Sequence, residues 1–481
     1  MPRDYFALIL NVLTLAGALM AGTALVRRHI SGRMAQAILD IVLVGLIILP
    51  ACSLLVAFSG RYPAIRQLPF RVVGQTTAAI LVATAVICGA YILIRKLHMR
   101  AAIVLLPLVF VTFGQAAWKV LTYNSEPFAN KPLAEFLPVQ SDSPRIVWLI
   151  FDRLDQRLSF VDRPRSIDLP QFDRLRSEAV YGSNAFPPSA YTIFTMPALV
   201  NGKIVGNSIQ RDIDTLLLRY DGADRDARWG ADASVFSEAR AEGYNSGVVG
   251  WYLPYCRIFN QSLSSCAWFE MARQHNSYDP TGSGGLPAVM WNEFRSLFET
   301  NFLSPFGQSL ATQKHARTYD TLLRTARKTI VDPRLNLVLV HLPIPHWPYF
   351  YNRTTGKYDL RNSLVYGYLD SLVLADLTLG IIRQDLEGAA LWDRTTVLVS
   401  SDHSHRSAPR HLDGKTNPRV PFLLKLAGQK TGVDLHSEFN TVLTKELLLA
   451  ILRREISTPQ HVSNWIEQHR SLAQSPYDRD L

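Results

Sequence analysis

Charged residues are absent from four long stretches near the beginning of the chain. No Asp, Glu, Lys or Arg occurs in residues 5–26, 41–60, 72–94 or 101–118. A bilayer's hydrocarbon core requires about 20 apolar residues per helix, and soluble helices of this length normally keep a polar face. The pattern therefore predicts four membrane spans, at about 5–26, 37–60, 72–94 and 101–118, within a transmembrane region of residues 1–121. No basic segment precedes the first apolar run, which argues against a cleaved signal peptide.

Excess basic charge is almost absent from the remainder of the chain. The formal net charge is +10, but residues 1–123 hold eleven Lys or Arg and two Asp, a net charge of +9, which leaves about +1 for the rest. The basic residues therefore flank the predicted spans, and we expect a membrane partner and no nucleic acid.

Cysteine is rare, with four residues among 481. Cys52 and Cys88 fall within predicted spans, whereas Cys256 and Cys266 lie ten positions apart in YCRIFNQSLSSC. This spacing predicts either a short-loop disulfide, formed in an oxidising compartment, or two unpaired buried thiols. Basic residues divide almost evenly between the loops on the two sides of the membrane. The cysteine pair therefore adds weight to a domain on the outer face.

The remaining chain alternates between two kinds of segment. Residues 122–143 are polar and predict a linker. After it, strand-length apolar runs (RIVWLIFD, NSGVVGWY, LNLVLVHL, TTVLVSSD and RVPFLLKL) are separated by helix-like stretches such as ASVFSEARAEG and YLDSLVLADLTLGIIRQDLEG. This alternation indicates an α/β fold, a sandwich with a mostly parallel central sheet. We expect the domain to span residues 144–456 and residues 457–481 to form a polar surface tail.

Acidic residues end two of the apolar runs. RIVWLIFD ends in Asp152, and TTVLVSSD ends in Asp402 with His403 directly after it. In parallel α/β folds the active site gathers at the carboxyl ends of the strands. Either Asp alone is explained by a helix cap or turn, but the pair with an imidazole supplies the ligands that zinc, manganese or magnesium needs.

Five segments follow one another in the order found in one enzyme superfamily. They are LPQFDRLRSEAVYGSNAF, SVFSEARAEGYNSGVVGWY, PHWPY, VLVSSDHS and RVPFLLKLAG. From about Arg145 to Gly428 the chain resembles the alkaline phosphatase superfamily, in the branch of sulfatases, phosphoethanolamine transferases and lipoteichoic acid synthases. The resemblance implies an alkaline-phosphatase-like sandwich, which the bundle of about four transmembrane helices precedes here.

The resemblance also points to a nucleophile. In this superfamily it begins a helix, ten residues before the glycine of a Leu-x-(Thr or Asn)-Gly turn. Counting back from Gly202 in LVNG gives Thr192, with Ser189 and Thr195 as competitors. Helix amides and a metal stabilise an alkoxide at such a position, and a plain helix cap is the alternative. Sulfatases need Cys or Ser there for conversion to formylglycine, so Thr192 favours phosphoryl transfer through a phosphothreonine.

One divalent metal, either zinc, manganese or magnesium, follows from the resemblance. Its implied ligands are Asp152, Thr192, Asp402 and His403, with Thr192 deprotonated by coordination. Two sulfatase features are missing, because Arg153 stands where sulfatases keep a second aspartate and Ser404 where a glycine follows Asp-His. These departures favour one metal over two.

Other polar residues have implied or alternative roles. His346 of PHWPY is expected to face the substrate phosphate, whereas Lys415 either contacts the anion or is a solvated loop residue. His405 and His411 bind a second metal, protonate the leaving group, or are surface residues. His341 is a further candidate ligand for a second metal, whose other ligands are not evident. Trp251 and Tyr252 replace the Lys-Trp that sulfatases use on sulfate, which again favours phosphoryl transfer.

Together these features predict a multi-pass protein of a bacterial inner membrane with its catalytic domain on the periplasmic face. The expected activity moves phosphoethanolamine or phosphoglycerol from a phospholipid donor to an envelope glycan or lipid acceptor. One alternative is a sulfatase-like hydrolase or phosphodiesterase that uses the same site. Another is an inactive membrane protein that uses the domain for binding.

Overall fold

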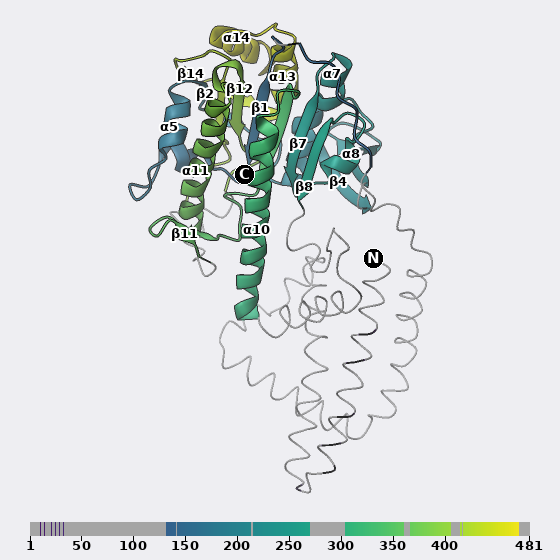
Figure 1. Cartoon of the computed structure of the whole chain (residues 1–481), viewed down its shortest axis with the longest axis vertical. Helices are drawn as coiled ribbons and strands as arrows, with labels where there is room; N and C mark the ends of the chain where they lie inside the picture. The colour runs from purple at the N-terminus through teal and green to yellow at the C-terminus, as the bar shows by residue number, and fades with distance from the viewer. Residues whose placement is uncertain are drawn as a thin grey trace. The chain divides into compact units, whose positions relative to one another are not determined.

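The computed structural model describes residues 131–140, 142–212, 215–269, 304–359, 366–405, 414–415 and 417–470, with isolated positions between 10 and 32 (Figure 1). The chain divides into two units, Met1–Glu126 with Asn276–Gly307, and Pro127–His275 with Gln308–Leu481. The fold below is that of the second unit. Apart from those isolated positions, the four predicted spans lie outside the described residues, as do His411 and parts of the expected linker and tail. Among the described residues, no helix combines the length and apolarity needed to cross a membrane.

An eight-stranded sheet forms the centre of this unit. Its strands, in spatial order, are β14 (Val433–Leu435), β2 (Val180–Gly182), β13 (Phe422–Lys425), β12 (Thr396–Ser400), β1 (Ile146–Phe151), β9 (Leu337–Leu342), β7 (Ser246–Trp251) and β8 (Ser265–Phe269). Adjacent strands are parallel except where β13 pairs with β12 and β2. The sheet is therefore mixed and mostly parallel.

Each central strand contributes to two separate hydrophobic cores. On β1, Ile146, Trp148 and Ile150 belong to the first core, whereas Val147 and Leu149 belong to the second. All five side chains are fully buried, since successive residues of a strand point to opposite faces of the sheet. Burial on both faces explains why the strand sequences are continuous apolar runs rather than alternating ones.

Helices cover both faces of the sheet. The first core includes residues of α6 (Thr192–Asn201), α7 (Val235–Ala241), α8 (Tyr255–Ile258), α13 (Thr444–Leu452) and α14 (Pro459–His469). The second includes residues of α5 (Pro170–Arg176), α10 (Ser304–Ile330) and α11 (Gly367–Gly388). In Figure 1, α10 and α11 lie over the same face of the sheet, and the hydroxyls of Tyr319 and Thr378 join them at 2.7 Å.

Short elements complete the described part. Three small sheets pair β4 (Val205–Asp212), β5 (Thr215–Tyr220) and β6 (Ala227–Arg228); β10 (Tyr351–Asn352) and β11 (Lys357–Tyr358); and β15 (Phe439–Asn440) and β3 (Ala185–Phe186). Single helical turns occur at η3 (Arg157–Val161), η4 (Trp392–Arg394) and η5 (Thr441–Leu443).

The predicted elements are present, with one difference in direction. The five apolar runs correspond to β1, β7, β9, β12 and β13, and the two amphipathic stretches to α7 and α11. β13 runs against both of its neighbours, so the parallel arrangement applies to the other strands only. β2 and β14 have three residues each, too few to form a recognisable periodic pattern.

The expectation of a polar surface tail does not hold for the start of residues 457–481. Thr458 caps α14 by accepting the N–H of His461. Val462 and Ile466 of this helix are buried in the first core. Their i, i+4 spacing gives α14 an apolar stripe that faces the domain, which explains why it packs despite its polar composition.

Cys256 of α8 and Cys266 of β8 form a disulfide, the first of the two alternatives drawn from their spacing. β8 is an edge strand of the sheet, so the disulfide links this edge strand covalently to α8.

Asp376 of α11 holds the start of α5 in place. Its Oδ1 accepts the backbone N–H groups of Gln171 at 3.0 Å and Phe172 at 2.8 Å. Burial raises the pKa of Asp376 to about 6, although these two donors oppose the shift. The folded protein therefore holds a proton on Asp376 more readily than the unfolded chain does.

We predict that Asp376 weakens the fold as the pH rises from about 4 to about 6, because the carboxyl ionises against its burial. Asp376→Asn keeps an acceptor oxygen and does not titrate. The difference in unfolding free energy between wild type and variant should therefore shift by roughly 2 kcal/mol in favour of the variant between pH of about 4 and about 7. Urea unfolding at both pH values measures it, and an unchanged difference contradicts the assignment.

Candidate active site

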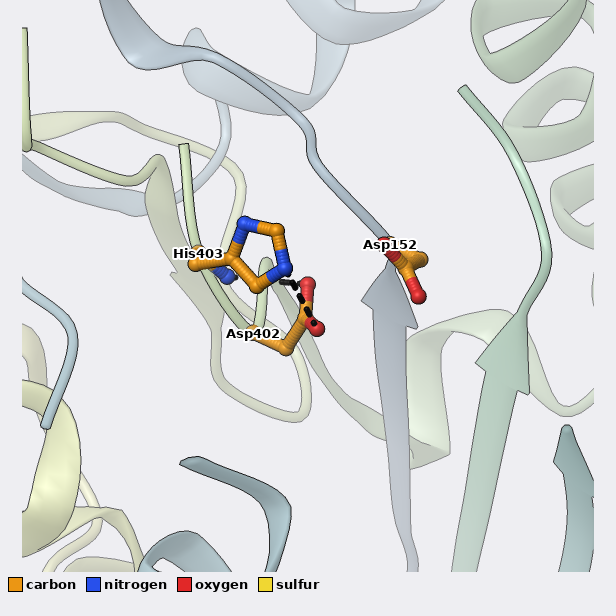
Figure 2. Close-up of side chains that lie close together, drawn as sticks. All are labelled: Asp152, Asp402 and His403. Atoms are coloured by element: carbon orange, nitrogen blue, oxygen red, sulfur yellow. Dashed lines mark hydrogen bonds and ion pairs between the residues drawn. The ribbon is translucent and has the colours of Figure 1, made fainter. Parts of the chain in front are cut away.

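Asp152, Asp402 and His403 meet at one edge of the central sheet (Figure 2). Asp152 follows β1, and Asp402 and His403 follow β12, which pairs with β1 in parallel. The three residues are at most 1% exposed, and one ligand atom from each lies within 4.8 Å of the others. The three residues therefore form a buried group consistent with a divalent metal site.

Thr192 completes this cluster from the first position of α6. Its Oγ1 donates to Asp402 Oδ2 at 2.6 Å and lies 3.4 Å from His403 Nε2 and 3.5 Å from Asp152 Oδ2. No side chain caps the beginning of α6. Of the three hydroxyl candidates, Thr195 is directed elsewhere, because its buried Oγ1 donates to the carbonyl of Ser189 at 2.9 Å.

Hydrogen bonds orient the two ligands that follow β12. Asp402 Oδ1 accepts the backbone N–H groups of His403 at 2.8 Å and Arg153 at 3.1 Å, which turns its Oδ2 toward Thr192. His403 Nδ1 donates to the carbonyl of Ser404 at 2.9 Å. In the neutral ring this leaves Nε2 as the unprotonated nitrogen that faces the other ligands, as metal binding requires.

The donor set fits a divalent metal on chemical grounds. Two carboxylates, one imidazole nitrogen and one hydroxyl oxygen are ligands that zinc, manganese and magnesium accept to different degrees. Burial disfavours the ionised form of Asp402, but the nearby His403 and His341 and the Thr192 hydroxyl bring its pKa below the ordinary value. Two ionised carboxylates in a buried site require a compensating positive charge.

Three histidines surround the buried indole of Trp251. The ring centroids of His346, His315 and His341 lie 5.1, 5.7 and 6.0 Å from that of Trp251. His346 Nδ1 donates to the carbonyl of Trp347. Burial, with a contribution from the charge of Arg153, holds the pKa of His346 well below its ordinary value. His346 is therefore neutral at pH 7, with Nε2 as its acceptor nitrogen.

His341 lies beside the metal group without joining it. Its Nε2 is 3.9 Å from Asp152 Oδ2, and its Nδ1 is 3.0 Å from the hydroxyl of Tyr255. Burial lowers the pKa of His341 to about 4, so the ring is neutral at pH 7. His341 therefore lies next to Asp152, on the neighbouring strand β9, but neither it nor His405 belongs to the metal group found among the described residues.

The remaining predicted residues have separate environments. His405 is 3% exposed and stacks on Tyr368, with centroids 3.8 Å apart and planes 5° apart. The interpretation of His405 as a surface residue is therefore wrong. Lys415 is exposed, and its carbonyl accepts from the Arg157 guanidinium at 3.4 Å.

Ser401 and Tyr368 support the site through hydrogen bonds, and the sequence did not predict either role. Ser401 Oγ lies 2.7 Å from the Phe151 carbonyl and accepts the N–H of Leu154 at 2.9 Å, which ties the ends of β12 and β1 together. Tyr368 donates its hydroxyl to the carbonyl of Arg153 at 2.7 Å. Ser401 stood in the quoted SSDH run, but Tyr368 is 215 positions from Arg153 and has no local signal.

Comparison with known proteins identifies the family. A model of the sulfatase family matches residues 144–444. No curated protein sequence matches the chain. Similar solved structures include a Bacteroides thetaiotaomicron protein of glycosaminoglycan metabolism, with 14% identity, 70% of this chain and 81% of that chain covered, and a TM-score of 0.46. A Pseudoalteromonas sulfatase has 12% identity, coverages of 65% and 68%, and a TM-score of 0.45.

A phosphonate monoester hydrolase of Agrobacterium radiobacter has 14% identity, coverages of 64% of this chain and 74% of that chain, and a TM-score of 0.40. The family match carries the assignment, because it includes more than half of the 481 residues and all of Asp152, Thr192, Asp402 and His403. The chain belongs to the sulfatase family, within the alkaline phosphatase superfamily, and is a sulfatase-like enzyme.

Proposed function

We propose that this enzyme cleaves a phosphate ester with Thr192 as its nucleophile and a divalent metal as its cofactor. The observation that carries the proposal is the position of Thr192 Oγ1, 2.6 Å from Asp402 Oδ2 and within 3.5 Å of Asp152 and His403. A role as a helix cap does not explain why this hydroxyl contacts three buried residues of the kind that bind metals. When bound, the metal supplies positive charge that favours an alkoxide and the developing charge of the phosphoryl oxygens.

Side chains of this protein supply the attacking oxygen and the acceptor for its proton. The Thr192 hydroxyl donates to Asp402 Oδ2, which orients Oγ1 and gives its proton a path out of the site as the Oγ1–phosphorus bond forms. The bond to the leaving oxygen breaks, and that oxygen takes up a proton from solvent. Thr192 is the first residue of α6, where the positive end of the helix dipole favours negative charge. The product of this step is a phosphothreonine at position 192.

A phosphate ester fits this site better than a sulfate ester does. A threonine is not converted to formylglycine, the nucleophile of sulfatases. Trp251, which replaces a sulfate-contacting lysine, is 1% exposed and packs among the histidines. His346 completes the second step, because its neutral ring has Nε2 ready to accept the proton of the incoming hydroxyl group.

For the acceptor, we propose an envelope glycan or lipid, with a phospholipid as donor of phosphoethanolamine or phosphoglycerol. The four charge-free stretches of residues 1–121 support this choice, because anchoring at an inner membrane keeps the site in reach of a donor that stays in the bilayer. A second candidate is hydrolysis, which the sulfatase-family match favours. Product analysis separates them: transfer leaves the head group on the acceptor, whereas hydrolysis releases it into solution.

We predict that incubation with phospholipid vesicles phosphorylates the wild-type chain at Thr192 and that Thr192→Ala lowers kcat/KM by about 10³-fold or more. Peptide mass spectrometry and diacylglycerol release are the measurements. Thr195→Ala is the matched control, because its hydroxyl serves the Ser189 carbonyl and not the site. Full activity in Thr192→Ala, or modification at another hydroxyl, contradicts the assignment.

We also predict that Asp402→Asn and His403→Gln weaken Zn²⁺ binding by about 100-fold or more, because each removes a ligand. Competition with a chromophoric chelator gives the affinity. His405→Gln is the control, since this ring stacks on Tyr368 and lies outside the three-residue metal group. Equal losses in all three variants would show that the metal lies elsewhere.

A further inference from the structure

Arg153 has an uncommon backbone conformation beside the metal group. Its φ is +68°, in the left-handed region that favours glycine. Both of its backbone groups are used there: its N–H donates to Asp402 Oδ1 at 3.1 Å, and its carbonyl accepts from the Tyr368 hydroxyl at 2.7 Å. Strained residues that their surroundings hold in this way cluster at functional sites.

The Arg153 side chain lies at the site rather than in solvent. It is 22% exposed, and its Nε is 4.0 Å from Asp152 Oδ1. Within the described part of the chain, this buried Nε has no hydrogen-bond partner. The charge of Arg153 also lowers the pKa of His346 and opposes the burial that raises the pKa of Tyr349 to about 12. The guanidinium therefore lies near both the metal group and His346.

When a divalent metal is bound, Arg153 adds a positive charge that the two carboxylates of the site do not balance. The two carboxylates of the metal group, Asp152 and Asp402, balance the charge of one divalent metal. A guanidinium beside that metal repels it, so metal binding does not explain why an arginine is held here under strain. A bound oxyanion does explain it, because an arginine fork and a metal together stabilise phosphoryl oxygens.

We propose that the Arg153 guanidinium binds a non-bridging oxygen of the phosphate ester and so makes the site selective for oxyanions. This inference rests on the proposed function, since it assigns the substrate contact of the same site. Its test does not require turnover, because inorganic phosphate alone is a sufficient probe. A failure of the phosphothreonine prediction would therefore leave the contact separately testable.

The experiment titrates inorganic phosphate into the Zn²⁺-loaded full-length chain by calorimetry. Arg153→Asn and Arg153→Gly remove the charge but suit the left-handed backbone. We expect the Kd for phosphate to rise about 10- to 100-fold in both, and less in Arg153→Lys, which keeps the charge but loses the fork. Zn²⁺ affinity should stay equal or increase, because a repelling charge is removed.

Arg454 provides a matched control. It is also an arginine in the left-handed region, with φ of +62°, but its side chain is 57% exposed and pairs with Asp142 at 2.9 Å. Arg454→Gly relieves the same backbone strain and should leave phosphate affinity unchanged. Unchanged phosphate affinity in Arg153→Asn and Arg153→Gly would overturn the proposal, and so would a parallel loss of Zn²⁺ affinity, which would indicate a structural role.

Discussion

The parallel pairing of β1 with β12 is the constraint on which the site depends. Ile150 is in register with Ser400, so Asp152 and Asp402, each two residues further on, leave the sheet at the same level. Their separation of 250 positions along the chain is thereby reduced to contact through Thr192. β9 continues the arrangement, because His341 is also paired with Ile150 and its Nε2 lies 3.9 Å from Asp152 Oδ2.

Burying two carboxylates at the end of apolar strands is costly unless every oxygen is compensated. The chain supplies part of the compensation through backbone N–H groups of Arg153 and His403 and the hydroxyl of Thr192. The divalent cation proposed above would supply the rest, and its binding would then be coupled to local stability in this region. Arg153, whose backbone is strained, has two roles here. Its N–H donates to Asp402 and holds that carboxylate in place, and its side chain adds the positive charge that binds an oxyanion.

The sequence predicted those strands and site residues that can be recognised from a short segment of the chain alone. Fully buried strands such as β1 and β12 are continuous apolar runs, and the polar residues directly after them mark the edge where the site lies. The approach of Thr192 to that edge followed from a family spacing rather than from local pattern. The antiparallel direction of β13, the support from Tyr368 and the burial of His405 depend on tertiary contacts between distant segments. Such contacts produce no periodic pattern in the sequence. The helix α14 was not predicted because its polar residues outnumber Val462 and Ile466, the two apolar residues that are buried.

The central claim is that one divalent ion joins Asp152, Thr192, Asp402 and His403. Anomalous diffraction from crystals of the Zn²⁺-loaded chain tests it most directly. The account predicts a single strong peak at about 2.0–2.2 Å from an oxygen or nitrogen of each of the four side chains. A peak bound by other residues, or one that leaves Thr192 Oγ1 beyond about 3 Å, would contradict it.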